Sequence, residues 1–302
     1  MPEDIKDQQK KILVVLAHPD DESFGMGGTL ALYARQGVDV RLVCATRGEV
    51  GEVDPSFKET IKSAACLRTQ ELRCAVDALG LSELYFLNYR DSGMPGSEDN
   101  HHPRALAAQP VAQVAAEVAH LIREVRPQVV LTFDLIGGYR HPDHIAIQKA
   151  TVQAFDLAAS SDFADPDGLP AFQADALYFH TMNKTYLKMA IVVMRLIGQN
   201  PREFGRNKDI DLVSLTEVEF PTHARINYRS VRAAKTAAAA CHASQGGAQM
   251  NKGLRGLIGR LFGGYNDTFM QAYPEPVAGQ KVKRDLFEKL GEGNGEEGIS
   301  EK

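Results

Sequence analysis

The sequence predicts an α/β fold of the Rossmann-like kind, in which a largely parallel sheet carries helices on both faces. Short β-branched runs alternate with longer segments whose apolar residues recur at helical spacing, and this alternation is typical of parallel sheets. The first run, residues 11–17, is apolar almost throughout, as expected of a strand buried on both faces. Such sheets form their sites at the carboxyl ends of strands, beside the point where the strand order reverses.

Each expected element is bounded by a recognisable signal. Gly37 and Gly80 follow the first two helices in the usual C-terminal position, and Pro127 stops the third. Loops rich in Gly, Pro and Asp are expected at 88–104 and 162–170. The expected strands are 11–17, 38–45, 84–87 and 129–133, with weaker candidates at 177–180 and 212–215. The expected helices are 29–36, 56–79, 111–126, 145–159, 186–197 and 231–241.

Composition and charge limit the class of protein. The chain has 302 residues, 44 % hydrophobic and 24 % charged, which is ordinary for a globular protein with a sizeable core. We expect one α/β domain over 11–290, with a variable region at about 160–275. A polar extension, 1–10, precedes it and a disordered acidic tail, 291–302, follows it. The 34 basic and 39 acidic residues give a net charge of −5, which argues against a broad nucleic-acid surface.

The cysteines and the apolar stretches indicate the cellular compartment in which the protein is expected. The four cysteines form no CxxC pair, so we expect free thiols in a reducing environment. No signal-peptide core is visible, and the apolar stretches are too short to span a bilayer. The expected protein is therefore cytoplasmic, and a homo-oligomer is compatible with it. The four cysteines are Cys44, Cys66, Cys74 and Cys241.

Two clusters of chemically active residues follow strands. The segment 18–22, His-Pro-Asp-Asp-Glu, comes directly after the first strand, and 139–144, Tyr-Arg-His-Pro-Asp-His, comes after the fourth. They become neighbours if the two strands are adjacent. The ligand set this suggests is His18, Asp21 and His144, because two imidazoles and a carboxylate suit Zn²⁺ with one position left for water. Fe²⁺ suits the same ligands.

The remaining residues of the two clusters fit supporting roles. Asp20 can accept a proton from water as a general base. His141 can stabilise an oxyanion or protonate a leaving amine, and Asp143 can orient His141. Three adjacent acids behind one histidine repel one another unless a cation compensates them, which is the reason for preferring a site over a plain turn.

Ala-His-Pro-Asp-Asp-Glu at 17–22 and His-Pro-Asp-His at 141–144 resemble the motifs of the LmbE/PIG-L superfamily of zinc-dependent N-deacetylases. The resemblance covers about 11–150 and returns near 241. It implies the same metal ligands, with Asp20 as the base and His141 assisting the oxyanion or the leaving group.

Further stretches resemble the mycothiol-pathway deacetylase and the related conjugate amidase. They are 46–52, 68–71, 90–94, 137–139 and 242–245. This likeness implies that Arg68 and Asp91 hold the sugar and that Tyr139 lies near the scissile carbonyl. Glu49 is expected as a further substrate contact, as an acceptor for a hydroxyl group. Arg140 stands where that family usually has a small Gly, which adds a cation beside the site.

The expected function is that of a metal-dependent hydrolase. Attack of metal-bound water on the amide would remove an acetyl group from an N-acetylglucosamine-type sugar or glycoconjugate. One alternative is a metal-dependent amidase that acts on a larger acyl-amide, such as a thiol-cofactor conjugate. Another is a metal-binding protein without catalysis. A dinucleotide-binding oxidoreductase is disfavoured, because acids fill the turn where a pyrophosphate would lie.

Overall fold

The computed structural model describes residues 9–51, 53, 63–205, 208, 210–250 and 264–288. Within these ranges seven strands form one sheet in the order β3-β2-β1-β4-β5-β7-β6. The five strands from β3 to β5 are parallel, and β7 runs antiparallel to both β5 and β6. The largely parallel α/β sheet is therefore confirmed. The strands are β1 Lys11–Leu16, β2 Asp39–Thr46, β3 Glu83–Tyr89, β4 Val129–Phe133, β5 Ala176–Thr181, β6 Ala224–Asn227 and β7 Asn266–Tyr273.

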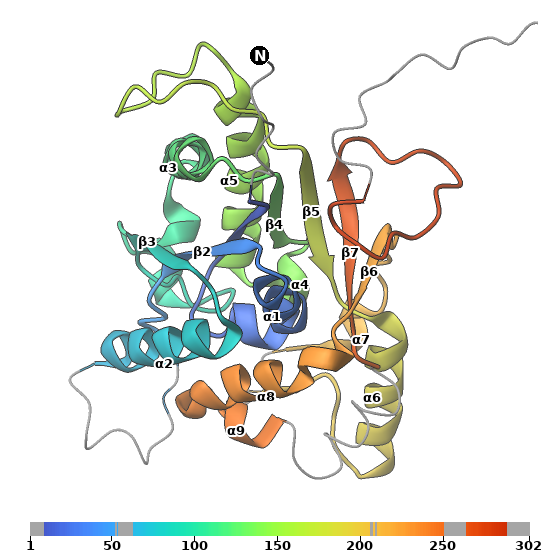
Figure 1. Cartoon of the computed structure of the whole chain (residues 1–302). Coiled ribbons are helices and arrows are strands. Elements are labelled where there is room, and N and C mark those ends of the chain that lie inside the picture. The colour runs from blue at the N-terminus through green and yellow to red at the C-terminus, as the bar shows by residue number, and fades with distance from the viewer. Residues whose placement is uncertain are drawn as a thin grey trace, which may run out of the picture.

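Helices cover both faces of the sheet. Helices α3 and α5 pack together on one face, and α1, α2 and α8 lie on the other (Figure 1). None of the described helices combines the length and the apolar character needed to cross a membrane. The helices are α1 Gly27–Arg35, α2 Ala64–Leu79, α3 Val111–Val125, α4 Gly137–Arg140, α5 Pro142–Ala159, α6 Lys184–Leu196, α7 Leu212–Leu215, α8 Arg232–Cys241 and α9 Gly247–Met250, with a π-helical turn at Glu22–Met26.

Strand β1 is the middle one of the five parallel strands and lies at the switch point of the sheet. Its side chains from Ile12 to Leu16 are buried on both faces, which explains the unbroken apolar run. Strand β1 has β2 on one side and β4 on the other, and Ile12 of β1 lies opposite Val129 of β4. The chain therefore moves outward through β2 and β3 and then returns beside β1. The two motif-bearing strands are adjacent, which is the condition for the two clusters to be neighbours, and their carboxyl ends meet at one edge.

The helix ends follow the local sequence. The Ser63 side chain accepts a hydrogen bond from the N–H of Cys66 at the start of α2, and Gly80 closes the helix with a φ of 74°. The expected start of this helix, 56–62, lies outside the described residues. Helix α5 begins at Pro142, three residues earlier than expected, with His141 as its N-cap. The second motif therefore occupies the first turn of a helix.

Two parts of the expected topology need correction. Residues 212–215 form helix α7 and not a strand, because the Asp211 carboxylate accepts from the N–H groups of Val213 and Ser214 and caps a helical turn. Strands β6 and β7 carry too many polar residues for the apolar pattern to reveal them. The first eight residues of the expected N-terminal extension and the tail 291–302 lie outside the described residues.

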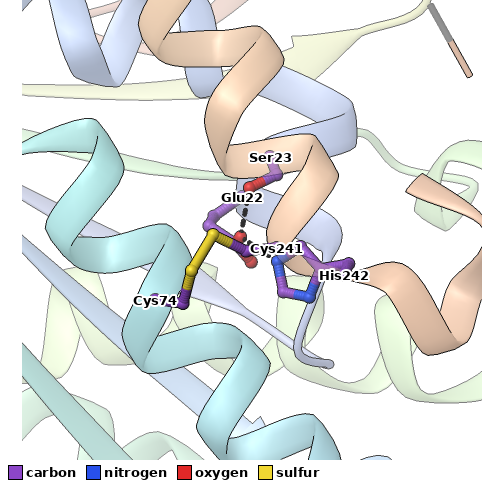
Figure 2. The surroundings of a disulfide bond; sticks show 5 residues. All are labelled: Glu22, Ser23, Cys74, Cys241 and His242. Carbon is purple, nitrogen blue, oxygen red and sulfur yellow. Dashed lines mark hydrogen bonds and ion pairs between the residues drawn. A yellow bond between two sulfur atoms is a disulfide. The ribbon is translucent and has the colours of Figure 1, made fainter. Parts of the chain in front are cut away.

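The cysteines also need correction. Cys74 on α2 and Cys241 at the end of α8 form a disulfide, with their Cα atoms 5.8 Å apart (Figure 2). The two residues are 167 positions apart, so no spacing motif marks the pair, and packing of α2 against α8 brings them together. Cys44, which is buried, and Cys66, which is exposed, are free. The expectation of four free thiols is wrong, and the argument for a reducing compartment loses its basis.

Acid is expected to destabilise the fold through His180. Burial lowers the pKa of this imidazole, which packs against Phe269, to about 4. The unfolded chain binds a proton more readily than the folded chain between about pH 6.5 and pH 4, so the free energy of unfolding falls as the pH drops through this window, by up to about 3 kcal/mol. Denaturant unfolding of the wild type and of His180→Asn across pH 4–7 checks this. A pH profile of the same slope in both proteins would contradict it.

Candidate metal centre

His18 is held at both ring nitrogens at the carboxyl end of β1. Its Nδ1 lies 3.1 Å from Nε2 of His144, and its Nε2 lies 3.0 Å from Oδ2 of Asp143. The ring is almost fully buried. Because the carboxylate of Asp143 can only accept, Nε2 of His18 carries a proton, and in the neutral imidazole that binds a metal Nδ1 keeps a lone pair. The lone pair points toward His144.

His144 is fixed in the same manner from the first turn of α5. Its Nδ1 donates to the carbonyl oxygen of Gly137 at 3.1 Å, so in the neutral imidazole its Nε2 also keeps a lone pair. The ring stacks on Phe133, the last residue of β4, with the ring centroids 4.0 Å apart. Gly137 has a φ of 64°, and a Cβ there would lie 2.7 Å from Cβ of His144. A glycine is therefore needed for this approach.

Asp21 contacts both imidazoles through different carboxylate oxygens and completes a triangle of candidate ligand residues. Its Oδ1 lies 3.2 Å from Nε2 of His144, and its Oδ2 lies 3.6 Å from Nδ1 of His18. The backbone N–H of His18 also donates to Oδ2 at 2.7 Å. Burial alone would raise the pKa of Asp21, but His144 and His18 hold it well below the usual range. The carboxylate is therefore ionised.

The triangle fits a small divalent cation. Zinc bonds of about 2.0–2.1 Å in a tetrahedron place the ligand atoms about 3.3 Å apart. The 3.1 Å between the two imidazole nitrogens and the 3.2 Å from His144 to Oδ1 of Asp21 are close to this, while the other oxygen of Asp21 lies 3.6 Å from His18. Two imidazole lone pairs and a carboxylate that face one another repel without a positive charge between them. Among the described residues, two groups have ligand atoms that all lie within 4.8 Å of one another: His18 with His141 and His144, and His18 with Asp91, His141 and Asp143. Asp21 is in neither group and joins the cluster through its separate contacts with His18 and His144. These contacts make the cluster a candidate metal site.

Asp20 lies beside this triangle in an unusual backbone conformation. Its φ is 124°, a region that favours glycine, so the surrounding structure has to hold it there. Its carboxylate accepts from Nη2 of Arg68 at 3.2 Å. Burial raises the pKa of Asp20 to about 6, against the lowering effect of the Arg68 guanidinium. A carboxylate with a pKa near the working pH suits a general base.

His141 is a neutral imidazole with one free donor. Its Nδ1 accepts a hydrogen bond from the backbone N–H of Asp143 at 3.2 Å, so its Nε2 carries the proton. Burial and the neighbouring rings of His18 and His144 hold its pKa well below the usual range. The group therefore offers an N–H, without a positive charge, beside the cluster.

Asp143 makes different contacts from those expected. Its carboxylate contacts His18 and accepts from both the backbone N–H and the hydroxyl of Ser92, and it makes no described hydrogen bond with the ring of His141. The bond between Asp143 and His141 comes from the backbone instead. The contacts of Asp143 suit a residue that orients His18.

The three expected substrate contacts lie around the cluster, but each is engaged within the protein. Asp91 accepts from the N–H of Gly93 and lies 3.5 Å from Nε2 of His18. Glu49 accepts from the N–H of Asp91 at 3.0 Å. Arg68 is buried and donates to Asp20 and to the carbonyl of Pro19. These contacts place all three as supports of the centre. Their expected contacts with substrate stay predictions.

Tyr139 and Arg140 connect the centre to a cavity of about 210 Å³. The Tyr139 ring packs edge-on against His144, with the centroids 4.9 Å apart. Arg140 is exposed and adopts a φ of 70°. The cavity wall contains Arg140, while Tyr139 lies both in this wall and against His144. A cation beside the histidine cluster stays a prediction. The cavity is lined by Met94, Pro95, Tyr139, Arg140, Asp211, Ser214 and Leu215.

Two buried residues near the centre were missed as site residues. The Glu22 carboxylate accepts from the backbone N–H of Asp20 at 3.0 Å and lies 2.7 Å from Nε2 of His242. The three adjacent acids are thus separated by their partners: Asp20 faces Arg68, Asp21 faces the imidazoles, and Glu22 faces His242. A single cation does not compensate all three. The sequence contains both residues in motif stretches, but their pairing over 220 positions leaves no spacing signal.

A buried histidine–carboxylate cluster at the switch point of a parallel sheet is an arrangement suited to metal-assisted hydrolysis. The family described as "PIG-L: GlcNAc-PI de-N-acetylase" matches residues 13–155. A relative that is 35% identical matches this chain almost end to end, so the chain belongs to the PIG-L family.

Two relatives carry the name 1D-myo-inositol 2-acetamido-2-deoxy-alpha-D-glucopyranoside deacetylase. The protein of Catenulispora acidiphila, numbered 2, is 35% identical over 305 residues, which cover 94% of this chain and 98% of that one. The protein of Kineococcus radiotolerans is 46% identical over 187 residues, 57% of this chain and 52% of that one. This second match therefore spans about half of that protein's length.

A solved structure shares the fold. The N,N'-diacetylchitobiose deacetylase of Pyrococcus horikoshii superimposes with a TM-score of 0.61, over 87% of this chain and 84% of that one, at 21% sequence identity. The likeness at this identity concerns the fold, and it agrees with the sheet and helix layers described above.

Proposed function

We propose that this protein is a metal-dependent hydrolase that removes the acetyl group from an N-acetylglucosamine-type sugar or glycoconjugate. The observation that carries the proposal is the convergence of two imidazole lone pairs and the Asp21 carboxylate, with Asp20 directly beside them. The family and the names of the relatives support the same reaction, since both describe de-N-acetylation of glucosaminyl compounds.

His18, Asp21 and His144 would hold the cation, and Zn²⁺ and Fe²⁺ both suit these ligands. When bound, the cation polarises the amide carbonyl and lowers the pKa of a water molecule. Both imidazoles are oriented toward the cation site by hydrogen bonds at their other ring nitrogens. Asp143 accepts from Nε2 of His18, and the Gly137 carbonyl accepts from Nδ1 of His144. The protein thus supplies three ligands whose orientation is set before the cation arrives.

Asp20 and His141 would carry the proton and the developing charge. Asp20 takes a proton from the attacking water as the new carbon–oxygen bond forms. The Nε2–H of His141 donates a hydrogen bond to the developing oxyanion, which a neutral imidazole can do without giving up its proton. When the carbon–nitrogen bond breaks, the proton held by Asp20 is available to the leaving amine. Water and the N-acetyl sugar thus give acetate and the free amine.

The cavity beside Tyr139 is where we propose that the sugar binds. It adjoins the histidine cluster through the Tyr139 ring, and a volume of about 210 Å³ takes part of a glycoconjugate. Arg140 would contribute a cation to its wall. The relatives' names point to a glucosaminyl inositol as a first substrate to try.

A screen for acetate release tests the proposal. The metal-loaded protein is mixed with N-acetylglucosamine, with N,N'-diacetylchitobiose and with a 2-acetamido-2-deoxyglucosyl inositol, each with and without a chelator. We expect release of acetate that the chelator abolishes and added Zn²⁺ restores. Metal-independent release would refute the proposal. Faster cleavage of a bulky acyl-amide than of the acetyl group would establish the amidase alternative instead.

A further inference from the structure

Asp20 is held from two sides by residues distant in sequence. On one side, Arg68 of α2 donates from Nη2 to the Asp20 carboxylate and to the carbonyl of Pro19, at 3.2 and 2.8 Å. On the other side, the backbone N–H of Asp20 donates to Oε2 of Glu22 at 3.0 Å. A φ of 124° is unfavourable for an aspartate, so contacts have to hold it. These two contacts do so together with the N–H groups of Ser23 and Phe24, which donate to the Asp20 carbonyl oxygen.

Glu22 depends in turn on His242. Both side chains are fully buried. Oε1 of Glu22 accepts from the hydroxyl of Ser23 at 2.5 Å and lies 2.7 Å from Nε2 of His242, so the imidazole is the donor that offsets the buried carboxylate (Figure 2). Nδ1 of His242 has no hydrogen-bond partner within the described residues, and Glu22 is the group to which the ring is tied.

His242 is itself placed by a cross-link. It directly follows Cys241, whose disulfide with Cys74 fastens the end of α8 to α2. Ser244 adds two hydrogen bonds, from its N–H and its hydroxyl, to the carboxylate of Glu71, also on α2. Helix α2 therefore carries Arg68, which holds the Asp20 carboxylate, and also anchors the segment that holds the Asp20 backbone through Glu22.

We propose that His242 is a positioning residue for Asp20: the Cys74–Cys241 disulfide fixes its imidazole against Glu22, and Glu22 fixes the backbone of Asp20. This inference rests on the proposed function, because the position of Asp20 matters to the rate only if Asp20 is the base. Replacement of His242 should change kcat and leave KM unchanged, because His242 contacts Asp20 only through Glu22 and does not line the described cavity.

Replacement of His242 by leucine and by glutamine separates positioning from packing. Leucine removes the donor, whereas the glutamine amide can donate to Glu22 as Nε2 does. We expect His242→Leu to lower kcat at least about tenfold, with KM and metal content little changed, because a small misplacement of a catalytic group is costly. His242→Gln should keep most of kcat. Equal losses in both variants, or none in His242→Leu, would overturn the proposal.

The cross-link gives a second, independent variant. Cys74→Ser should lower kcat in the same direction and leave KM unchanged, whereas Cys66→Ser, which removes an exposed free thiol, should not change it. In the double variant of Cys74→Ser and His242→Leu, the loss of kcat should be smaller than the two single losses combined, since both changes act on one contact.

A packing control is His120→Leu. It breaks another histidine–carboxylate pair, the one between His120 and Asp165 on the opposite face of the sheet. If His242→Leu does not fold, unchanged kcat in Cys74→Ser overturns the proposal.

A readout without substrate distinguishes this inference from the proposed function. The Asp20 amide should exchange its hydrogen at least about tenfold faster in Cys74→Ser and in His242→Leu than in the wild type, with His242→Gln close to the wild type. If the two variants exchange faster but the wild type releases no acetate from any substrate, the positioning contact is supported and the proposed deacetylase function is refuted. Unchanged exchange would refute the contact even where acetate is released.

Discussion

Asp20→Asn is expected to lower kcat by at least about 100-fold while the protein still takes up its metal. Asparagine keeps the shape of the side chain and an oxygen for Arg68, but it cannot accept a proton from water. The three proposed metal ligands are not altered. Initial rates of acetate release and the metal content of the purified variant, measured side by side, check both halves of the expectation.

A charge-matched control is available on α2. Asp77→Asn removes one carboxylate from an exposed position of that helix, and its kcat should equal that of the wild type. If Asp20→Asn retained full activity, Asp20 would not be the base. A protein with bound metal and no hydrolytic activity against any of the sugars would support the alternative of a metal-binding protein without catalysis.

His144→Ala should have the largest effect on the metal itself. It removes Nε2, which lies at distances of 3.1 and 3.2 Å from the other two corners of the triangle. We expect the affinity for Zn²⁺ to fall by more than about 100-fold, since loss of groups behind the ligands alone typically costs about 10–100-fold. Activity should disappear with it. Competition with a chromophoric chelator measures the affinity.

Asp143→Asn provides the graded comparison. It leaves the triangle intact but weakens the acceptor that orients His18, so an intermediate loss of about 10–100-fold in affinity is expected. His120→Ala, on α3, should bind Zn²⁺ as the wild type does. If His144→Ala bound Zn²⁺ with unchanged affinity, the triangle would not be the metal site and the proposed function would lose its main support.

Much of the fold was predictable because its central part follows local rules. Strand β1 is continuously apolar, α2 ends at Gly80, and α3 stops ahead of Pro127. The antiparallel strands β6 and β7 were not predicted, because a strand with a half-exposed or polar pattern contains no apolar run that would indicate it. The 212–215 segment was mistaken for a strand because its apolar residues do not reveal the Asp211 cap.

The grouping of the candidate site residues was predictable for a topological reason. Each motif is contiguous in sequence and begins near the carboxyl end of its strand, so adjacency of β1 and β4 brings them together. Partners that depend on tertiary packing were not predictable. Asp143 was expected at the His141 ring and lies at His18, and neither the Glu22–His242 pair nor the disulfide leaves a trace in local spacing.

The place of β7 in the sheet has a consequence for synthesis on the ribosome. Strand β6 is hydrogen-bonded to β7 within the sheet, and β5 reaches β6 only through β7, although β7 is the last of these strands to be made. A nascent chain that has emerged as far as β6 therefore leaves an edge of β5 without its neighbour. That edge is covered only when residues 266–273 have left the exit tunnel, so the chain completes its sheet late in translation.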